Sequence, residues 1–225
     1  MRSLWSLVAA LERHYGPPAQ GPARGPLELI LYENVAYLAS EDRRERAFRE
    51  LKKRVGTQPE DLLLAPMELL TSITAIGGIF PELRAWRLQQ IAQLVRDLHA
   101  GDLDRVLSME LSSARRAFRK FPTIGEPGAD KILLFTGAFP LLALESNGVR
   151  VLVRFGFARE QKSYSATYRA LQNALRSEIG NKYEPLIKAH LLLKRHGQEI
   201  CRRSQPRCPD CVLRETCAFP SAEQP

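Results

Sequence analysis

The chain has 225 residues and a formal net charge of +8, with an isoelectric point of about 9.6. Its length allows one large domain or two small ones with a substantial buried core. No apolar run approaches the roughly 18–20 residues needed to span a bilayer, so we expect no membrane segment. The excess of Lys and Arg suits a polyanionic partner, because phosphate contacts by these side chains release counterions, although the same charge also favours solubility.

The first residues are compatible with a short signal peptide or with a helix of the mature fold. Apolar residues recur at helical spacing past the charged Glu12 and Arg13. We therefore interpret the segment as an amphipathic helix, with an apolar stripe that comprises Leu4, Leu7, Val8, Leu11 and Tyr15.

Residues 16–26 contain four Pro and three Gly, which indicates an irregular connector. Beyond it the apolar spacing is helical, with no β-alternation of useful length and no internal repeat. Residues 149–153 fit either a strand or a helix. The predicted fold class is all-α. Residues 57–60 fit a helix-capping pattern, so a helix is expected to begin there. The other expected helices span residues 27–39, 42–55, 66–73, 81–99, 102–107, 111–121, 125 to about 137, 164–179 and 185–196.

All four cysteines of the chain lie in one loop with the spacing C-x6-C-x2-C-x5-C. Two disulfides would suit a secreted protein, but nothing else in the chain looks secreted. A structural zinc site usually has two C-x2-4-C pairs, whereas this loop has one. Four thiolates in uneven loops suit the larger core of an iron–sulfur cubane, so the spacing favours a cluster over zinc and zinc over disulfides.

The cysteine spacing, with His196-Gly197 just before it, closely resembles the carboxy-terminal loop of the endonuclease III superfamily of DNA glycosylases. The resemblance implies a [4Fe-4S] cluster with Cys201, Cys208, Cys211 and Cys217 as ligands. It extends from about residue 27 to 217 and implies a two-domain helix-hairpin-helix DNA glycosylase fold. A six-helix barrel domain would comprise residues 27–137, and an iron–sulfur cluster domain residues 1–26 and 138–225.

Residues 121–129 resemble the family's hairpin, a hydrophobic-Pro-Gly-hydrophobic-Gly turn that opens into a helix. In such a turn, backbone N–H groups meet a DNA phosphate near the helix N-terminus. Gly125 is retained, whereas Thr123 replaces the first glycine. We expect DNA contacts from Thr123, Gly125 and Gly128; an ordinary helix–turn–helix corner is the alternative.

The bifunctional members of the family carry a lysine two residues after the second hairpin glycine, and this lysine attacks the sugar C1′. Pro127, which has no amine, occupies that place in this chain. Lys131 lies one helical turn further on. We expect it to be a solvated lysine that contacts DNA rather than a relocated nucleophile.

Residues 144–156 resemble the family's Val-Asp-Thr-His-x-x-Arg-Val-x-x-Arg-x-Gly run, with Arg150, Arg154 and Gly156 in register. Glu145 stands at the aspartate position, so the resemblance implies a catalytic carboxylate that is one methylene longer. The alternative role for Glu145 is a helix N-cap or an ion-pair partner of Arg150.

Glu33 falls where the adenine-removing branch of the family has a catalytic glutamate, but the glutamines that follow in that branch are absent. Tyr37 could stack on a base, although a helix-core tyrosine is the favoured interpretation. In the cysteine loop, Arg202, Arg203 and Arg207 are expected to bind DNA phosphates.

The resemblance implies a monofunctional DNA glycosylase that hydrolyses the N-glycosidic bond of a damaged or mismatched base, with little or no AP-lyase activity. The alternative is a catalytically silent DNA- or lesion-binding protein, and a third hypothesis makes the cluster a redox sensor of the DNA-bound state. We expect a monomer that binds double-stranded DNA with a flipped base. Its expected location is the cytoplasm, associated with the nucleoid, because clustered reduced cysteines suit a reducing compartment.

Overall fold

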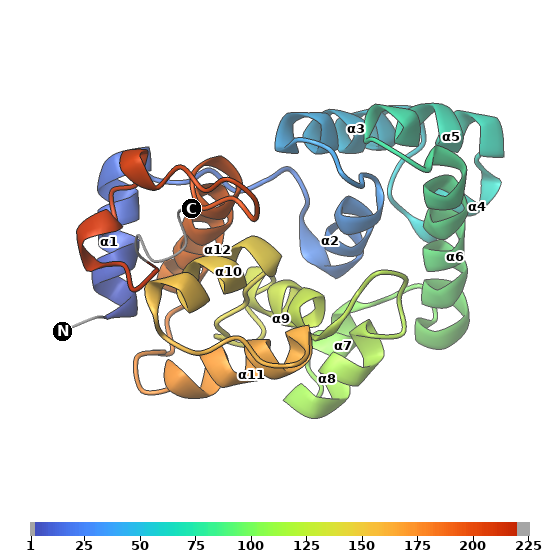
Figure 1. The fold of residues 1–225 in the computed structure, drawn as a ribbon. Coiled ribbons are helices and arrows are strands. Elements are labelled where there is room, and N and C mark those ends of the chain that lie inside the picture. Colours follow the sequence, from blue (N-terminus) through green and yellow to red (C-terminus); the bar gives the residue numbers. More distant parts are fainter. Residues whose placement is uncertain (1–2, 220–225) are drawn as a thin grey trace. The chain divides into compact units, whose positions relative to one another are not determined.

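The structure is a computed structural model that describes residues 3–219, which form helices joined by turns and loops (Figure 1). The predicted all-α class is confirmed. None of the helices in the described range is long and apolar enough to cross a membrane. The chain divides into two compact units: Gly21–Ala138, and Met1–Gln20 together with Phe139–Pro225. That residues 27–137 form a separate domain stays a prediction.

The unit Gly21–Ala138 is built around α6 (Pro81–His99), which packs against α2, α4 and α5. Four fully buried residues of α6 recur at i, i+3, i+4 and i+7, the spacing of one helical face: Leu88, Ile91, Ala92 and Val95. The other helices of this unit are α2 (Gly25–Asn34), α3 (Glu41–Arg54), α4 (Pro59–Leu64), α5 (Met67–Ile76), α7 (Asp104–Leu107), α8 (Leu111–Phe118) and α9 (Glu126–Phe135).

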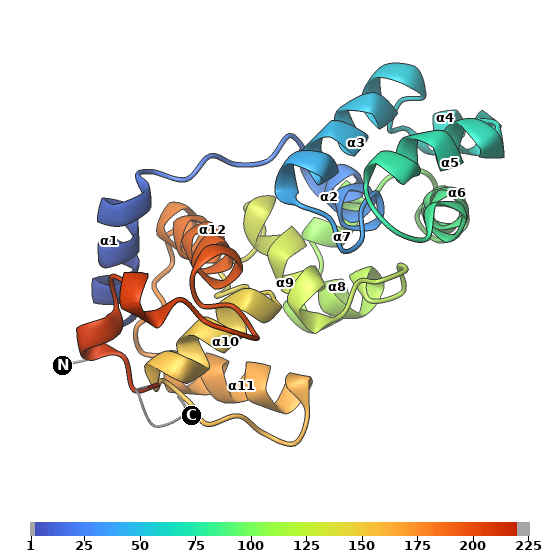
Figure 2. The ribbon, with the colours of Figure 1, turned by 45° about the horizontal axis from the view of Figure 1, so that its top comes forward.

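The second unit is centred on α12 (Tyr183–Glu199), which packs against α1 (Leu4–Tyr15) and α10 (Ser146–Phe155). Both views show α1 beside α12 (Figures 1 and 2). Four of the five residues of the apolar stripe of α1 are buried, and Tyr15 is half-buried, which confirms the interpretation of the segment as a helix of the fold. A Cβ at Gly197 would lie 2.6 Å from the Asn147 Cβ, so the glycine permits the close approach of α12 to α10. The unit also contains α11 (Tyr164–Ala174) and the short turns η1 (Cys208–Asp210) and η2 (Arg214–Thr216).

One difference from the predicted elements is the end of α2. The apolar pattern predicts a helix to residue 39, but α2 ends at Asn34, and Tyr37 and Leu38 are 52% and 73% exposed. Residues 149–153, for which strand and helix were both open, are helical within α10. The capping pattern is shifted by one residue, because the Asp61 carboxylate accepts a hydrogen bond from the Gln58 N–H.

The loops after α2 and after α5 are joined by one buried guanidinium group. Arg84 is 2% exposed and donates hydrogen bonds to the carbonyls of Val35, Gly78 and Ile79 at 2.6, 2.7 and 2.8 Å. Tyr37 and Gly78 also pair as an isolated parallel bridge. These bonds explain why α2 stops early, since the chain after Asn34 bonds to a neighbouring loop instead of continuing the helix.

We predict that Arg84→Leu lowers the free energy of unfolding by about 3 kcal/mol or more, because one buried and two partly buried hydrogen bonds to backbone carbonyls are lost. Urea unfolding followed by circular dichroism measures the change. Arg96→Leu on the same helix is the control, since that side chain is 53% exposed and surface changes cost about 0.5 kcal/mol or less. Equal stability of the two variants would contradict the bracing role of Arg84.

Candidate functional site

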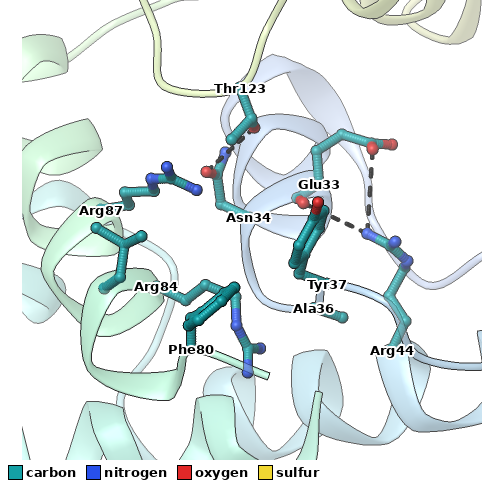
Figure 3. Close-up of a pocket in the computed structure, with 10 residues that line it drawn as sticks. Glu33, Asn34, Ala36, Tyr37, Arg44, Phe80, Arg84, Arg87 and Thr123 are labelled. Atoms are coloured by element: carbon teal, nitrogen blue, oxygen red, sulfur yellow. Dashed lines mark hydrogen bonds and ion pairs between the residues drawn. The ribbon is translucent and has the colours of Figure 1, made fainter. Parts of the chain in front are cut away.

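A pocket of about 520 Å³ opens in the unit Gly21–Ala138 (Figure 3). The end of α2, the loop that follows it, the start of α6 and the turn before α9 contribute side chains to its wall. The wall combines aromatic rings, guanidinium groups, an amide and a carboxylate. Such a mixture of apolar and polar groups is typical of a ligand site. Residues discussed below that line it are Glu33, Asn34, Tyr37, Arg44, Phe80 and Thr123.

Glu33, predicted as a catalytic candidate, forms an ion pair with Lys131 of α9, with Oε1 and Nζ 2.5 Å apart. Its Oε2 lies 4.0 Å from the Arg44 guanidinium (Figure 3). The Lys131 side chain is only 13% exposed, and its ammonium lies over the rings of Tyr32 and Phe135. The prediction of a solvated Lys131 is therefore wrong, because the side chain turns to a carboxylate on a neighbouring helix. Its contact with DNA stays a prediction.

Tyr37 and Phe80 form a stacked pair at the pocket, with ring centroids 6.4 Å apart and an interplanar angle of 26°. The favoured interpretation of Tyr37 as a core residue is wrong, since Tyr37 and Phe80 are 52% and 58% exposed. Phe80 and Leu38 have positive φ angles of 56° and 49°, which large side chains rarely adopt. Hydrogen bonds that join Tyr37 to the backbone of Gly77 and Ile79 hold this conformation. We call Tyr37 and Phe80 the aromatic platform.

The turn between α8 and α9 has Thr123 where the predicted hairpin pattern has its first glycine. Thr123 has a φ of 64°, the left-handed region that favours glycine. Its hydroxyl donates to the Asn34 Oδ1 at 3.1 Å, and the Asn34 Nδ2 donates to the Pro122 carbonyl at 3.1 Å. Asn34 is 2% exposed, so the hairpin is anchored to α2 by a buried amide.

The start of α9 presents the other predicted hairpin residues. Gly125 is the exposed N-cap of α9, and Gly128 lies in its first turn beside Pro127. The first N–H groups of a helix have no intrahelical partner, so this end is suited to an anion. A Cβ at Gly128 would meet the Ile124 side chain at 3.4 Å, an ordinary contact. The DNA contacts of Thr123, Gly125 and Gly128 stay predictions.

An ion pair joins α8 and α9, the two helices on either side of the hairpin. Arg115 donates two hydrogen bonds to the fully buried Asp130 carboxylate, at 2.6 and 3.0 Å. Such two-point pairing fixes the relative orientation of the two side chains. Sequence reasoning missed this pair, since neither residue belongs to a recognised motif.

Glu145 is the N-cap of α10. Its Oε1 accepts a hydrogen bond from the Gly148 N–H at 2.8 Å, and its Oε2 accepts one from the Asn147 side chain at 2.7 Å. The N-cap role that was left open is therefore present, and a catalytic role stays a prediction. The Asn147 Oδ1 in turn accepts a hydrogen bond from Arg150 at 2.6 Å. Glu145 is thus connected through one side chain, Asn147, to Arg150, which binds carbonyls of the cysteine loop.

Arg150 and Arg154, which the sequence placed only in register with a family pattern, bind backbone carbonyls next to the cysteines. Arg150 donates to the carbonyls of Gly197 and Cys201, both at 2.8 Å. Arg154 donates to the carbonyls of Arg202 and Arg203 at 2.6 and 3.0 Å. Burial lowers the pKa of Arg150 from its usual value. Both guanidinium groups therefore fasten the cysteine loop to α10.

The four cysteines are all free thiols, so the structure contains neither of the two disulfides considered as an alternative. Burial raises the pKa of the Cys211 thiol; a hydrogen bond from the Leu213 N–H opposes this, and the charges of the other three cysteines raise it further. Within residues 3–219, no group of three or more His, Cys, Asp or Glu is arranged to hold a metal ion.

The surroundings of the sulfur atoms fit a negatively charged group held by thiolates. The Arg154 guanidinium lies 3.6 Å from the Cys201 Sγ, and the Leu213 N–H lies 3.4 Å from the Cys211 Sγ. N–H donors to ligand sulfur atoms are a regular feature of iron–sulfur sites. The N–H donors near the sulfur atoms and the four cysteine ligands themselves therefore fit the [4Fe-4S] group that the sequence predicts.

His196 lies behind this loop in a buried position, at 1% exposure. Its Nδ1 is 3.0 Å from the Tyr15 hydroxyl, and its Nε2 is 3.5 Å from the Cys211 Sγ. Burial, followed by the charge of His14, lowers the pKa of His196 to about 4. Burial also raises the pKa of Tyr15 to about 12, and the carboxylate of Glu199 adds to this effect.

The arginines of the cysteine loop differ in the contacts that they make within the protein. Arg202 and Arg203 are exposed, although the Arg202 Nε also donates to the Glu199 carbonyl at 3.1 Å. Arg207 forms an ion pair with Asp210, at 3.0 Å. An arginine that is already paired gains less from a phosphate, so the predicted DNA contact is best supported for Arg202 and Arg203.

Comparison with known proteins gives consistent results for sequence and fold. No family model matches the chain. Endonuclease III of Sulfolobus acidocaldarius is 24% identical over 174 residues, which cover 77% of this chain and 73% of the relative. A structure of a trapped endonuclease III–DNA covalent intermediate has a TM-score of 0.73 at 20% identity, with 97% of each chain covered. A thermostable thymine-DNA glycosylase has a TM-score of 0.74 at 15% identity, covering 96% of this chain and 95% of its own.

The relative and the solved structures match the chain over most of its length. The chain is similar in sequence to endonuclease III and has the fold of the helix-hairpin-helix DNA glycosylases.

Proposed function

We propose that this protein is a base-excision DNA glycosylase that hydrolyses the N-glycosidic bond of a damaged or mismatched base, with little or no AP-lyase activity. Similarity in sequence and fold to base-excision repair glycosylases supports the glycosylase activity. Pro127 in the first turn of α9 supports the proposed lack of AP-lyase activity. It stands where the resemblance places the lyase lysine, and it has no amine. The nearby Lys131 is paired with Glu33, which argues against a substitute nucleophile.

Water is the proposed nucleophile, and a carboxylate is needed to activate it or to stabilise the positive charge on the sugar as the base leaves. Glu145 is the first candidate, because two hydrogen bonds hold its carboxylate in a fixed orientation. Glu33 is the second, because it faces the 520 Å³ pocket. Its negative charge is, however, largely balanced by Lys131 and Arg44.

The DNA contacts we propose are of two kinds. The start of α9 and the exposed Arg202 and Arg203 bind phosphates. The aromatic platform stacks on a base exposed by unpairing, since aromatic faces accept any base and unstacking is required when a nucleotide is flipped. Its rigid backbone favours this role, because little ordering is needed on binding.

We also propose that Cys201, Cys208, Cys211 and Cys217 hold a [4Fe-4S] cluster. When bound, the cluster would supply a covalent crosslink for the loop and a one-electron centre. The chain's own contribution is the fixed loop backbone, held by Arg150 and Arg154. A monomeric state and a cytoplasmic, nucleoid-associated location stay predictions.

A catalytically silent DNA- or lesion-binding protein is the second candidate function. The observation in its favour is that both candidate carboxylates have structural partners: Glu145 caps α10, and Glu33 is paired with Lys131. This alternative predicts tight, salt-sensitive binding without release of a base.

End-labelled duplexes with single lesions test the loss of lyase activity. We expect the wild-type protein to leave abasic sites that break only after alkali, with no adduct trapped by borohydride. Pro127→Lys should gain a trapped adduct, because it restores an amine at the required place. A borohydride adduct with the wild-type protein would contradict the proposal. Absence of any abasic product across the lesion panel, with binding retained, would favour the binding protein.

Glu145→Gln should lower the single-turnover rate of base release by about 100-fold or more, because the variant loses the carboxylate while its amide oxygen can still cap α10. Affinity for the lesion duplex should change little. Glu160→Gln, at an exposed position of the same unit, controls for the change in net charge. If base release by Glu145→Gln proceeds at the wild-type rate, the catalyst is another residue, and Glu33→Gln is the next variant to measure.

Replacing either ring of the aromatic platform should weaken binding to a lesion duplex. For Tyr37→Ala and Phe80→Ala we expect a loss of about 1–3 kcal/mol each, or about 5- to 150-fold in Kd, because base stacking is lost. Fluorescence anisotropy measures the affinity. Leu64→Ala is the control, since Leu64 is 85% exposed but does not line the pocket. Unchanged affinity in both platform variants would refute the stacking role.

A further inference from the structure

Three segments that are distant in sequence meet at the buried ring of His196. Tyr15 is the last residue of α1, His196 lies near the end of α12, and Cys211 belongs to the cysteine loop. The two ring nitrogens of His196 face the other two residues, at 3.0 Å for the Tyr15 hydroxyl and 3.5 Å for the Cys211 Sγ. The ring is 1% exposed, so water does not compete for either nitrogen.

Chemistry assigns a direction to this chain of hydrogen bonds. A cysteine that binds iron is a thiolate, and a thiolate accepts a hydrogen bond but cannot donate one. The proton of the neutral His196 ring must therefore be on Nε2, which points to the Cys211 Sγ. The Nδ1 atom is then an acceptor, and the Tyr15 hydroxyl donates to it, because the partner of one ring nitrogen determines the state of the other.

The surroundings keep this arrangement in place. The Cys201 N–H and the Ile200 N–H both donate to the His196 carbonyl, at 2.8 and 3.0 Å, so the histidine backbone is tied to the first cysteine. The Arg195 guanidinium lies 4.5 Å from the centroid of the Tyr15 ring and holds that ring against α12. These contacts fix the positions of Tyr15 and His196 beside the cysteine loop.

We infer that Tyr15, His196 and Cys211 form a hydrogen-bond relay that raises the reduction potential of the iron–sulfur group at the cysteine loop. The inference rests on the cluster proposed above. An N–H donor reduces the negative charge on a ligand sulfur and so favours the reduced, more negative state. Tyr15 acts through His196 as a positioning residue, since it fixes the tautomer that donates to the sulfur.

The test is an anaerobic spectroelectrochemical titration of the full-length holoprotein, in which an electrode supplies one electron, no bond breaks and the proton stays on Nε2. His196→Leu should lower the potential by about 59 mV, the equivalent of a tenfold change in the one-electron equilibrium constant. Tyr15→Phe should shift it in the same direction by a smaller amount. His190→Leu is the matched control, because His190 is a 2% exposed histidine of α12 that faces the Ala143 carbonyl.

Each outcome decides the inference. Unchanged potentials in both His196→Leu and Tyr15→Phe overturn the relay, as does an equal shift in His190→Leu, which would indicate general loosening of α12. If His196→Leu fails to retain iron, the shift in Tyr15→Phe decides alone. A wild-type protein without iron and acid-labile sulfide overturns the cluster proposal itself, and this result is visible before any variant is measured.

Discussion

Guanidinium groups that hydrogen bond to backbone carbonyls hold the irregular segments of this protein in position. Loops between helices have no regular ladder of backbone hydrogen bonds, so their carbonyls need other donors when they are shielded from water. Arg84 supplies three such bonds to the loops beside the pocket, and Arg150 and Arg154 supply four to the cysteine loop. Part of the positive charge that the composition assigns to a polyanionic partner therefore serves the fold.

Hydrogen bonds to loop carbonyls also explain how the pocket presents apolar rings to solvent. Leu38 and Phe80 adopt positive φ angles at a cost of order 1–3 kcal/mol each, which persists only where the surroundings over-determine the conformation. The buried Arg84 and the hydrogen bonds between Tyr37 and the loop after α5 hold the backbone in this conformation. Thr123 follows the same logic, since a buried amide of Asn34 holds a left-handed residue where the related pattern has glycine.

The two candidate carboxylates have different electrostatic settings. Glu145 accepts hydrogen bonds from neutral N–H groups, whereas Glu33 faces two cations. Arg150 also acts electrostatically on Glu145, but the hydrogen bonds between them pass through the Asn147 side chain, whereas Lys131 contacts the Glu33 carboxylate directly. A carboxylate that is less neutralised can better stabilise the positive charge that develops on the sugar when the base leaves. This contrast is why Glu145 is the stronger candidate for catalysis and Glu33 for shaping the pocket. Glu145 is also joined through Asn147 and Arg150 to the cysteine loop, so its position depends on that loop.

The sequence alone determined the features that depend on short-range spacing. The all-α class follows from apolar periodicity, residues 81–99 were predicted with the observed bounds of α6, and the cysteine spacing led to the family. Contacts between distant residues were decided only by the tertiary structure. Glu33 and Lys131 are 98 residues apart, and Tyr15 and His196 are 181 apart. Periodicity reports which face of a helix is buried but not which side chains on other helices it meets, so neither the ion pair nor the relay has a signal in the local sequence.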